Sequence, residues 1–169
     1  PRSPPFDRFY RKFLAPTDAR MENVTNILWD LDPNVDWNYC TLRELRIGEN
    51  LELLMDATLF VRHPMHLSLS REDPTSMPSA NLRLVFAEAG GFDLRKLVLD
   101  ENRDYDGSKE IGDVFGVLLN DKRFFGEHRL FTVSGTFGQL SFYSLYPILE
   151  EDFGPLKNAF RSASSMNQT

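Results

Sequence analysis

Hydrophobic residues recur along this chain with two different periods, and the change of period divides the sequence. Up to Leu31 they return every three or four positions, which is typical of helices with one buried face. From Trp37 onward they return at every second position, which is typical of strands with one buried face. The pattern predicts a helical N-terminal segment, residues 5–31, followed by a β-rich body, residues 37–149.

Two helices are expected in the N-terminal segment. The first lies between Pro4-Pro5 and Pro16, and the second begins at Thr17 or Asp18 and ends before Asp32-Pro33. The apolar face of the first consists of Phe6, Phe9, Tyr10, Phe13 and Leu14, and that of the second of Met21, Val24, Ile27, Leu28 and Leu31. The first helix is short and has a basic polar face, so it could pack on its own sheet or on a second subunit in a homodimer.

The body contains about seven apolar rows separated by turn residues, and each row predicts a short strand. The rows are residues 45–47, 51–61, 65–69, 82–86, 94–99, 130–133 and 140–146. The last two flank the glycine-bearing stretch Ser134–Gly138 and predict a hairpin. We therefore expect an α+β fold that is mostly antiparallel β, either a β-sandwich or a strongly curved sheet, with the two N-terminal helices packed on it.

Length and composition agree with a single domain that spans residues 1–169, in which the polar tail 162–169 frays. The chain has 41% hydrophobic residues, and they include 14 phenylalanines. Its one cysteine, Cys40, excludes an internal disulfide and a multi-cysteine zinc site, and it favours a reducing compartment such as the cytoplasm. The longest apolar run, Val114–Leu119, is too short to span a membrane.

The formal net charge of −6 limits the partners that the chain could have. An acidic protein repels nucleic acid and anionic lipid, and its field steers a basic protein surface toward it. We therefore expect no nucleic-acid and no membrane partner. Aromatic and basic residues do alternate in the stretch 122–129, but we interpret its phenylalanines as core and its charges as rim.

One stretch has the spacing of a twelve-residue calcium loop with glycine at its sixth position, Gly107. Its oxygen donors would be Asn102, Asp104, Asp106, Glu110 and Asp113. Two features depart from the motif, since Asp113 stands where a bidentate glutamate is usual and Lys109 where an apolar residue is usual. The alternative is an exposed acidic turn. Calcium is the one cofactor for which the sequence gives a signal.

No catalytic motif is found. On a strand, His63 and His66 would point to opposite faces, so they would not converge on one metal ion. The carboxylates Glu150, Glu151 and Asp152 are interpreted as a solvated acidic face. Neither a nucleophile elbow nor a phosphate-binding loop is present. We therefore expect a protein without catalytic activity, while an active site built from dispersed residues stays open.

From about Thr41 to Leu149 the order of elements resembles that of small bacterial immunity proteins, which neutralise polymorphic toxins. The likeness rests on the strand Asn81–Phe86, its leucine-rich continuation Asp93–Leu99 and the closing strand Gly138–Tyr143. It implies a stoichiometric binder whose acidic surface blocks a basic toxin. It carries over no functional residue, and the N-terminal helices lie outside it.

Two functional hypotheses follow. The first is a non-enzymatic intracellular protein that binds another, basic protein, with acidic loop residues as the contact surface: Asp100, Glu101, Asp104, Asp106 and Glu110. The second is a small-molecule-binding or hydrolytic protein with an aromatic-lined pocket in a curved sheet. That pocket would be lined by Phe131, Phe142, Tyr143 and Tyr146. A flat acidic face over a closed core would favour the first, and a deep cavity the second.

Overall fold

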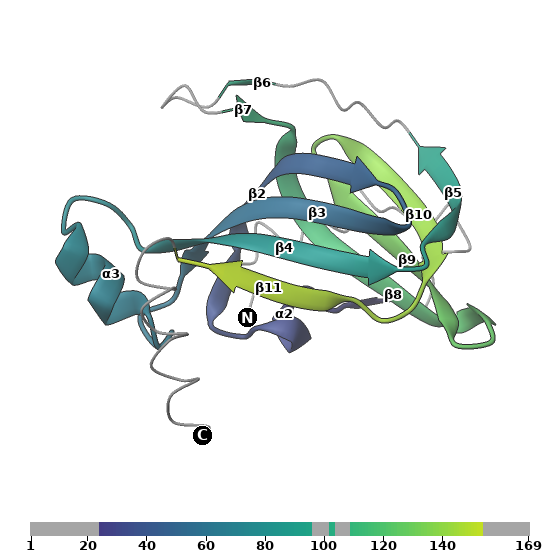
Figure 1. The fold of residues 1–169 in the computed structure, drawn as a ribbon, viewed down its shortest axis with the longest axis horizontal. Coiled ribbons are helices and arrows are strands. Elements are labelled where there is room, and N and C mark those ends of the chain that lie inside the picture. Colours follow the sequence, from purple (N-terminus) through teal and green to yellow (C-terminus); the bar gives the residue numbers. More distant parts are fainter. Residues whose placement is uncertain (1–23, 96–101, 104–108, 154–169) are drawn as a thin grey trace.

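The computed structural model describes residues 24–95, 102–103 and 109–153, and antiparallel strands make up most of them (Figure 1). The strands are β1 (Thr25–Asn26), β2 (Val35–Ile47), β3 (Asn50–Leu59), β4 (Ser79–Ala87), β5 (Gly90–Arg95), β6 (Asn102–Arg103), β7 (Lys109–Glu110), β8 (Gly112–Phe125), β9 (His128–Gly135), β10 (Gly138–Ser144) and β11 (Ile148–Asp152). The helices of this part of the chain are α2 (Leu28–Leu31) and α3 (His66–Glu72). Neither is long and apolar enough to cross a membrane.

Nine strands form one antiparallel sheet in the order β11-β4-β3-β2-β8-β9-β10-β5, with β1 also beside β8. The short strands β6 and β7 pair with each other in a separate ribbon. The prediction of a mostly antiparallel β fold is therefore confirmed. Because the nine described strands belong to one sheet, a sandwich of two separate sheets is not confirmed.

The sheet bends where β2 meets β8. These strands pair only at Thr41–Leu42 and Gly112–Asp113, and farther along β8 the short strand β1 pairs with Leu118 and Leu119 instead. The half formed by β11, β4, β3 and β2 thus diverges from the half formed by β8, β9, β10 and β5 and comes to lie opposite it (Figure 1). Ring contacts from Phe86 of β4 to Phe131 of β9 and Phe142 of β10 join the halves.

The core lies between the two halves, and β3 and β4 contribute to it by period-two alternation, whereas β8 and β9 are buried at consecutive positions. In β3 and β4 the buried residues are Leu51, Leu53, Met55, Ala57, Leu59, Ala80, Leu82, Leu84 and Phe86. Trp37, Phe131 and Phe142 are among the largest fully buried side chains. The strand predicted over 82–86 and the closing hairpin of β9 and β10 are confirmed. The strand predicted over 51–61 is confirmed as far as Leu59, and Val61 lies exposed in the turn that follows.

The second predicted helix is wrong for half of its described length, residues 24–31. Thr25–Asn26 forms a strand, and only the single turn Leu28–Leu31 is helical. The side-chain Oδ1 of Asn26 accepts the amides of Leu28 and Val117, at 3.3 and 3.2 Å, and this competes with helical hydrogen bonding. The first predicted helix and the tail 162–169 lie outside the described residues.

The strand predicted from Met65, Leu67 and Leu69 is also wrong, because this stretch forms α3. Met65 and Leu69 are four residues apart, which fits a helical face as well as a strand face. In the structure Met65 is buried, Leu69 is half-buried and Leu67 is exposed. A row of three apolar residues was too short to distinguish the two periods.

Candidate functional site

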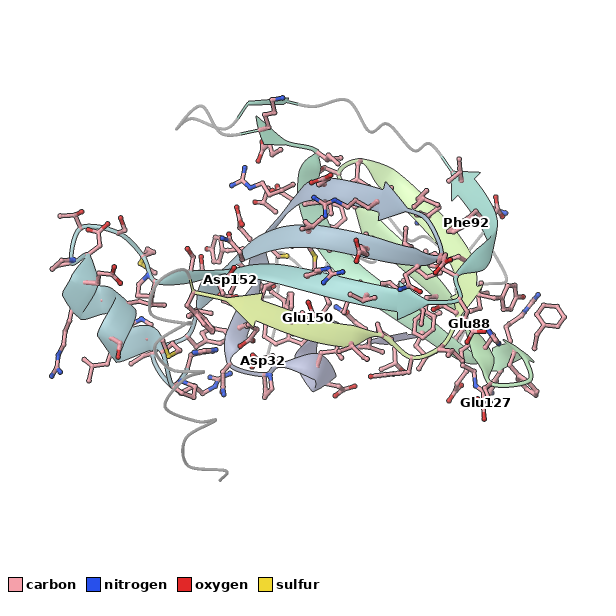
Figure 2. All side chains as sticks on the ribbon, viewed as in Figure 1. Asp32, Glu88, Phe92, Glu127, Glu150 and Asp152 are labelled. Carbon is pink, nitrogen blue, oxygen red and sulfur yellow. The ribbon has the colours of Figure 1, made fainter. Side chains whose placement is uncertain are left out.

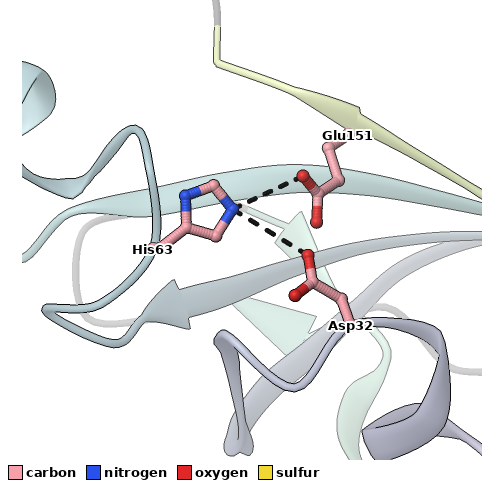
Figure 3. Close-up of side chains that lie close together, drawn as sticks. All are labelled: Asp32, His63 and Glu151. Carbon is pink, nitrogen blue, oxygen red and sulfur yellow. Dashed lines mark ion pairs between the residues drawn. The ribbon is translucent and has the colours of Figure 1, made fainter.

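Three titratable side chains from distant parts of the chain meet at one end of the sheet (Figure 3). They are Asp32 from the loop after α2, His63 from the turn between β3 and α3, and Glu151 from β11. His63 Nε2 lies 3.9 Å from Oδ2 of Asp32 and 3.5 Å from Oε2 of Glu151. We call this group the His63 cluster.

Asp32 is fixed by its backbone and by one of its carboxylate oxygens. Its amide donates to the carbonyl of Leu28 at 3.2 Å, and its own carbonyl accepts Trp37 Nε1–H at 2.9 Å. Oδ1 accepts the amide of Asn34, also at 2.9 Å. The other oxygen, Oδ2, is the one that lies toward His63. The orientation of the Asp32 carboxylate is therefore set by hydrogen bonds that do not involve His63.

His63 is almost fully buried, with 6% of its surface exposed. Its amide donates to the carbonyl of Phe60 at 2.9 Å, and its carbonyl accepts the amide of His66 at 3.0 Å. Its side-chain Nδ1 accepts the amide of Met65 at 3.0 Å, and its ring lies 5.3 Å from that of Phe153. The imidazole thus holds the turn that leads into α3.

Glu151 reaches the cluster because of the alternation along β11. Ile148, Glu150 and Asp152 lie on one face of this strand, and Leu149 and Glu151 lie on the other, less exposed face. Figure 2 labels Glu150 and Asp152 on β11 and Asp32 in the loop beneath it. The interpretation of residues 150–152 as one solvated acidic face is therefore wrong for Glu151, whose side chain is only 23% exposed.

The hydrogen bond from Met65 determines which tautomer the neutral imidazole adopts. Because Nδ1 accepts an N–H, it has no proton, and the ring proton must be on Nε2. Nε2–H then faces the two carboxylates. Burial lowers the pKa of His63, the Asp32 carboxylate raises it to a smaller extent, and the nearby His66 lowers it further. His63 is therefore neutral at neutral pH.

The same hydrogen bond bears on whether the cluster holds a metal ion. One donor atom from each of the three side chains lies within 4.8 Å of the others, a spacing that a metal site could have. A neutral histidine that binds a metal through Nε2 must have its proton on Nδ1 and normally donates it to an acceptor. Here Nδ1 faces the Met65 amide, which is a donor. The arrangement therefore fits a proton on Nε2 better than a metal.

A second contact joins the same two loops beside the His63 cluster. Arg62 donates to Oδ1 of Asn34 at 3.1 Å and to the carbonyl of Pro33. Its guanidinium lies 4.4 Å from the centroid of Phe60, which in turn stacks on Trp29. The loop after α2 and the end of β3 are thus held together independently of His63.

A different kind of surface lies at the turn of the β8–β9 hairpin. Phe124 and Phe125 are 58% and 69% exposed, so the interpretation of these phenylalanines as core is wrong. The ring of Phe125 packs edge to face against Tyr143, with 4.8 Å between centroids, and Arg129 lies 4.9 Å over the ring of Phe124. Figure 2 shows Glu88, Phe92 and Glu127 at this same end of the molecule. We call Phe124, Phe125, Arg129 and Tyr143 the hairpin-end surface.

The acidic contact residues and the calcium ligands predicted from the sequence are only partly placed. Asp100, Glu101, Asp104 and Asp106 lie outside the described residues. Asn102 pairs with Glu110 across the β6–β7 ribbon, and Asp113 pairs with Thr41 at the start of β8. The backbone of Asp113 also exchanges hydrogen bonds with Thr136. Calcium binding by this loop remains a prediction.

The four aromatic residues predicted to line a pocket do not share one environment. Phe131 and Phe142 are fully buried and stack with each other in the core, with 6.2 Å between centroids. Tyr146 is half exposed and contacts the edge of Phe131. Tyr143 contacts Phe125 in the hairpin-end surface instead.

Sequence reasoning missed the His63 cluster, although one signal for it was present. Along β11, Glu151 is two residues from Leu149 and therefore shares its face, which is where a strand of this fold buries its apolar side chains. The spacing of His63 and His66 instead predicts two imidazoles on opposite faces of a strand. Nothing in the sequence indicates that Asp32, a helix-stop residue, would meet either of them.

No family model matches this chain, and comparisons with curated proteins and with solved structures find no match either.

Proposed function

We propose that this chain is a non-enzymatic protein that binds another protein, and that the hairpin-end surface makes the contact. The observation that carries the proposal is the exposure of two adjacent phenylalanines, Phe124 and Phe125, at the end of one hairpin. Exposed aromatic side chains that lie close together are a frequent mark of an interaction site, because their burial by a partner is favourable.

The geometry of the hairpin explains why both rings reach solvent. Neighbouring residues of a strand point to opposite faces, so in the middle of a sheet one of the two would be buried. The pairing between β9 and β10 ends with Arg129 and Ser144, whereas β8 and β9 continue pairing to Phe125 and His128. The end of the hairpin therefore extends past β10 and has no strand beside it there among the described residues (Figure 1).

The composition of this surface also suits a protein partner. Phenylalanine, tyrosine and arginine are the residue types that protein interfaces favour. Arg129 is held in place, since it donates to the carbonyl of Gly126 at 2.7 Å while its guanidinium covers Phe124. A partner would meet side chains that are already ordered, so little conformational entropy would be lost on binding.

The partner that we propose is basic. The net charge of −6 would steer a positively charged protein toward the chain and would penalise an acidic one. The charges at the hairpin itself are mixed, with exposed Lys122 and Arg123 near exposed Glu127. The aromatic rings would therefore supply most of the binding affinity, and the net negative charge of the whole chain would raise the rate of association. The resemblance to immunity proteins makes a basic toxin in the cytoplasm the narrower form of this proposal.

The alternative of an aromatic-lined pocket has less support. Phe131 and Phe142 would have to leave the core to line a cavity, and both are fully buried against Phe86. Burial of one phenylalanine side chain stabilises a fold by about 1.5–3 kcal/mol relative to its exposure. Opening such a pocket would therefore lower the stability of the whole domain.

Site-specific crosslinking tests the proposal. A photoreactive phenylalanine analogue is placed at Phe125 in the full chain, and at exposed Met77 as a matched control, and both are irradiated in extract of the native cell. We expect one protein to be crosslinked from position 125 but not from position 77, and to bind the purified chain in calorimetry. The double variant Phe124→Ser/Phe125→Ser should lose at least about tenfold in affinity for it, and Met77→Ser should lose nothing.

Two outcomes would contradict this proposal. One is equal binding of the partner by the double serine variant and the wild type. The other is crosslinking of the chain only to a second copy of itself, together with a dimer in solution, which would make the surface a homodimer interface. For the narrower form, the chain is co-expressed with the product of each adjacent open reading frame. If none of these products co-purifies with the chain, the hypothesis of a toxin partner is rejected, but the more general proposal of a protein-binding function is not.

A further inference from the structure

We propose that His63 is a pH-operated latch: protonation at Nδ1 detaches its imidazole from the Met65 amide at the start of α3 and leaves it held by Asp32 and Glu151. The inference does not depend on the binding function proposed above. It concerns a different end of the molecule and a different chemistry.

The latch follows from the different partners of the two imidazole nitrogens of His63. At neutral pH, Nδ1 accepts the Met65 amide at 3.0 Å, and Nε2–H lies between two carboxylates at 3.5 and 3.9 Å. A proton taken from solvent forms an N–H bond at Nδ1, and this N–H then faces the N–H of Met65. Two donors cannot share a hydrogen bond, so the contact between His63 and Met65 breaks. The imidazolium meanwhile attracts both carboxylates more strongly than the neutral ring did.

The Met65 amide matters because, among the described residues, Leu69 is the one residue of α3 that packs against the hydrophobic core. None of the residues of α3 itself is buried, whereas Met65, immediately before the helix, is. The carbonyl of Met65 accepts the amide of Leu69 at 3.0 Å, so a movement of Met65 is passed to the first turn of the helix. Protonation of His63 would thus loosen α3 while the loop after α2 and β11 stay attached to the imidazole.

The charged groups that face His63 determine the direction of the response. In the described part of the chain they are Asp32 from the loop after α2, Glu151 from β11, and His66 from α3 itself. Burial and His66 disfavour the protonated form, and they outweigh Asp32, so the pKa of His63 in the folded protein lies below the 6.5 of an ordinary histidine. Folding therefore releases a proton, and the contribution of His63 to stability is complete above pH 6.5 and is lost as the pH falls through its folded pKa.

Nuclear magnetic resonance on the full chain tests the latch directly. At about pH 7.5 the histidine nitrogen shifts should identify the Nε2–H tautomer of His63. As the pH falls from about 7.5 through the titration of His63, which its own ring resonances report, the exchange protection of the Met65 amide should fall by about tenfold relative to its intrinsic rate, the factor that corresponds to the loss of one hydrogen bond. An Nδ1–H tautomer, or Met65 protection that does not change over this range, would overturn the proposal.

Two variants separate the latch from a general effect of acid. The substitution His63→Asn would keep an acceptor near the position of Nδ1, but the new amide cannot be protonated, so Met65 protection should become independent of pH. His128→Asn, at a half-buried position in β9, should leave the pH dependence of the wild type intact. If His63→Asn does not fold, the proposal is still tested by the tautomer of His63 and by the pH dependence of Met65 protection in the wild-type protein. Stoichiometric Zn²⁺ that shifts the His63 resonances would instead make the cluster a metal site and would also overturn the latch.

Discussion

Phe86 of β4 and Phe142 of β10 pack edge to face, with 4.8 Å between their ring centroids and 83° between their planes. The two strands belong to opposite halves of the bent sheet, and among the described residues the strand pairing between those halves joins only Thr41–Leu42 of β2 to Gly112–Asp113 of β8. Side-chain packing of this kind therefore provides much of the contact that keeps the two halves together.

Truncation of this aromatic contact should be costly. Phe142 is fully buried, and besides Phe86 it contacts Phe131 and Phe92. We expect Phe142→Ala to lower the free energy of unfolding by about 3–5 kcal/mol, because it removes buried apolar surface and leaves a cavity that the rigid sheet cannot close. Unfolding in urea, followed by tryptophan fluorescence, measures this loss. The matched control is Phe125→Ala, an exposed ring with one aromatic contact, which should cost no more than about 1.5 kcal/mol.

A buried pair of hydroxyl groups gives a second prediction. Thr132 of β9 and Ser141 of β10 are directly opposite each other, both are buried, and their oxygens are 2.8 Å apart. Thr132→Val alone should cost about 1–3 kcal/mol, because it leaves the Ser141 hydroxyl in the protein interior without this partner. The double variant Thr132→Val/Ser141→Ala should cost less than the sum of the two single variants. A double-mutant cycle in urea measures the difference, and strict additivity would mean that the two hydroxyls do not interact.

The sequence was informative wherever a segment alternates over many residues. The apolar rows of β3 and β4 follow directly from the period of two, because each of these strands covers one face of the core. The hairpin of β9 and β10 follows instead from the β-branched and aromatic residues on either side of a glycine-bearing turn. The signal failed where rows were short. Met65 and Leu69, four residues apart, fit both periods, and Asn26 competes with a helical pattern through its own side chain.

The candidate sites were harder to predict than the fold. The His63 cluster depends on three segments that only the bent sheet brings together, so no local pattern contains it. The exposure of Phe124 and Phe125 depends on how far β10 extends beside β9, and the alternation of a single strand does not reveal the length of its neighbour. Both sites are properties of the sheet rather than of any one strand.

Gly135 should be intolerant of a larger residue. It ends β9 at a point where a Cβ atom would meet the carbonyl of Asp113 and the ring of Phe137. Because both obstacles are held in the sheet and the core, we expect Gly135→Ala to lower the free energy of unfolding by about 3 kcal/mol or more. Gly48 has open space around it, and Gly48→Ala should change stability by no more than about 0.5 kcal/mol. Thermal unfolding of the two variants side by side tests this, and equal losses would show that crowding at Gly135 is not the cause.

The single cysteine should make stability depend on alkaline pH. Cys40 is buried in β2, and its Sγ lies 3.8 Å from the Sδ of Met55. Burial, with smaller effects from the carboxylates of Asp56 and Asp113, raises the pKa of the thiol far above its ordinary value of 9.0. The unfolded chain therefore loses this proton near pH 9 while the folded protein keeps it, so the contribution of Cys40 to stability is complete below that pH and falls above it.

The contribution of Cys40 to the loss of stability at alkaline pH can be isolated by comparison with Cys40→Ala. The other groups that titrate at alkaline pH are the same in both proteins, so they affect both equally. Above about pH 9 the free energy of unfolding of the wild type should fall faster than that of the variant, by up to about 1.4 kcal/mol per pH unit. Urea unfolding between about pH 8 and about pH 10.5 measures both curves. Parallel curves would mean that the folded thiol ionises as readily as the unfolded one. In that case a thiol reagent should also label Cys40 in the native protein, whereas burial requires the chain to open first.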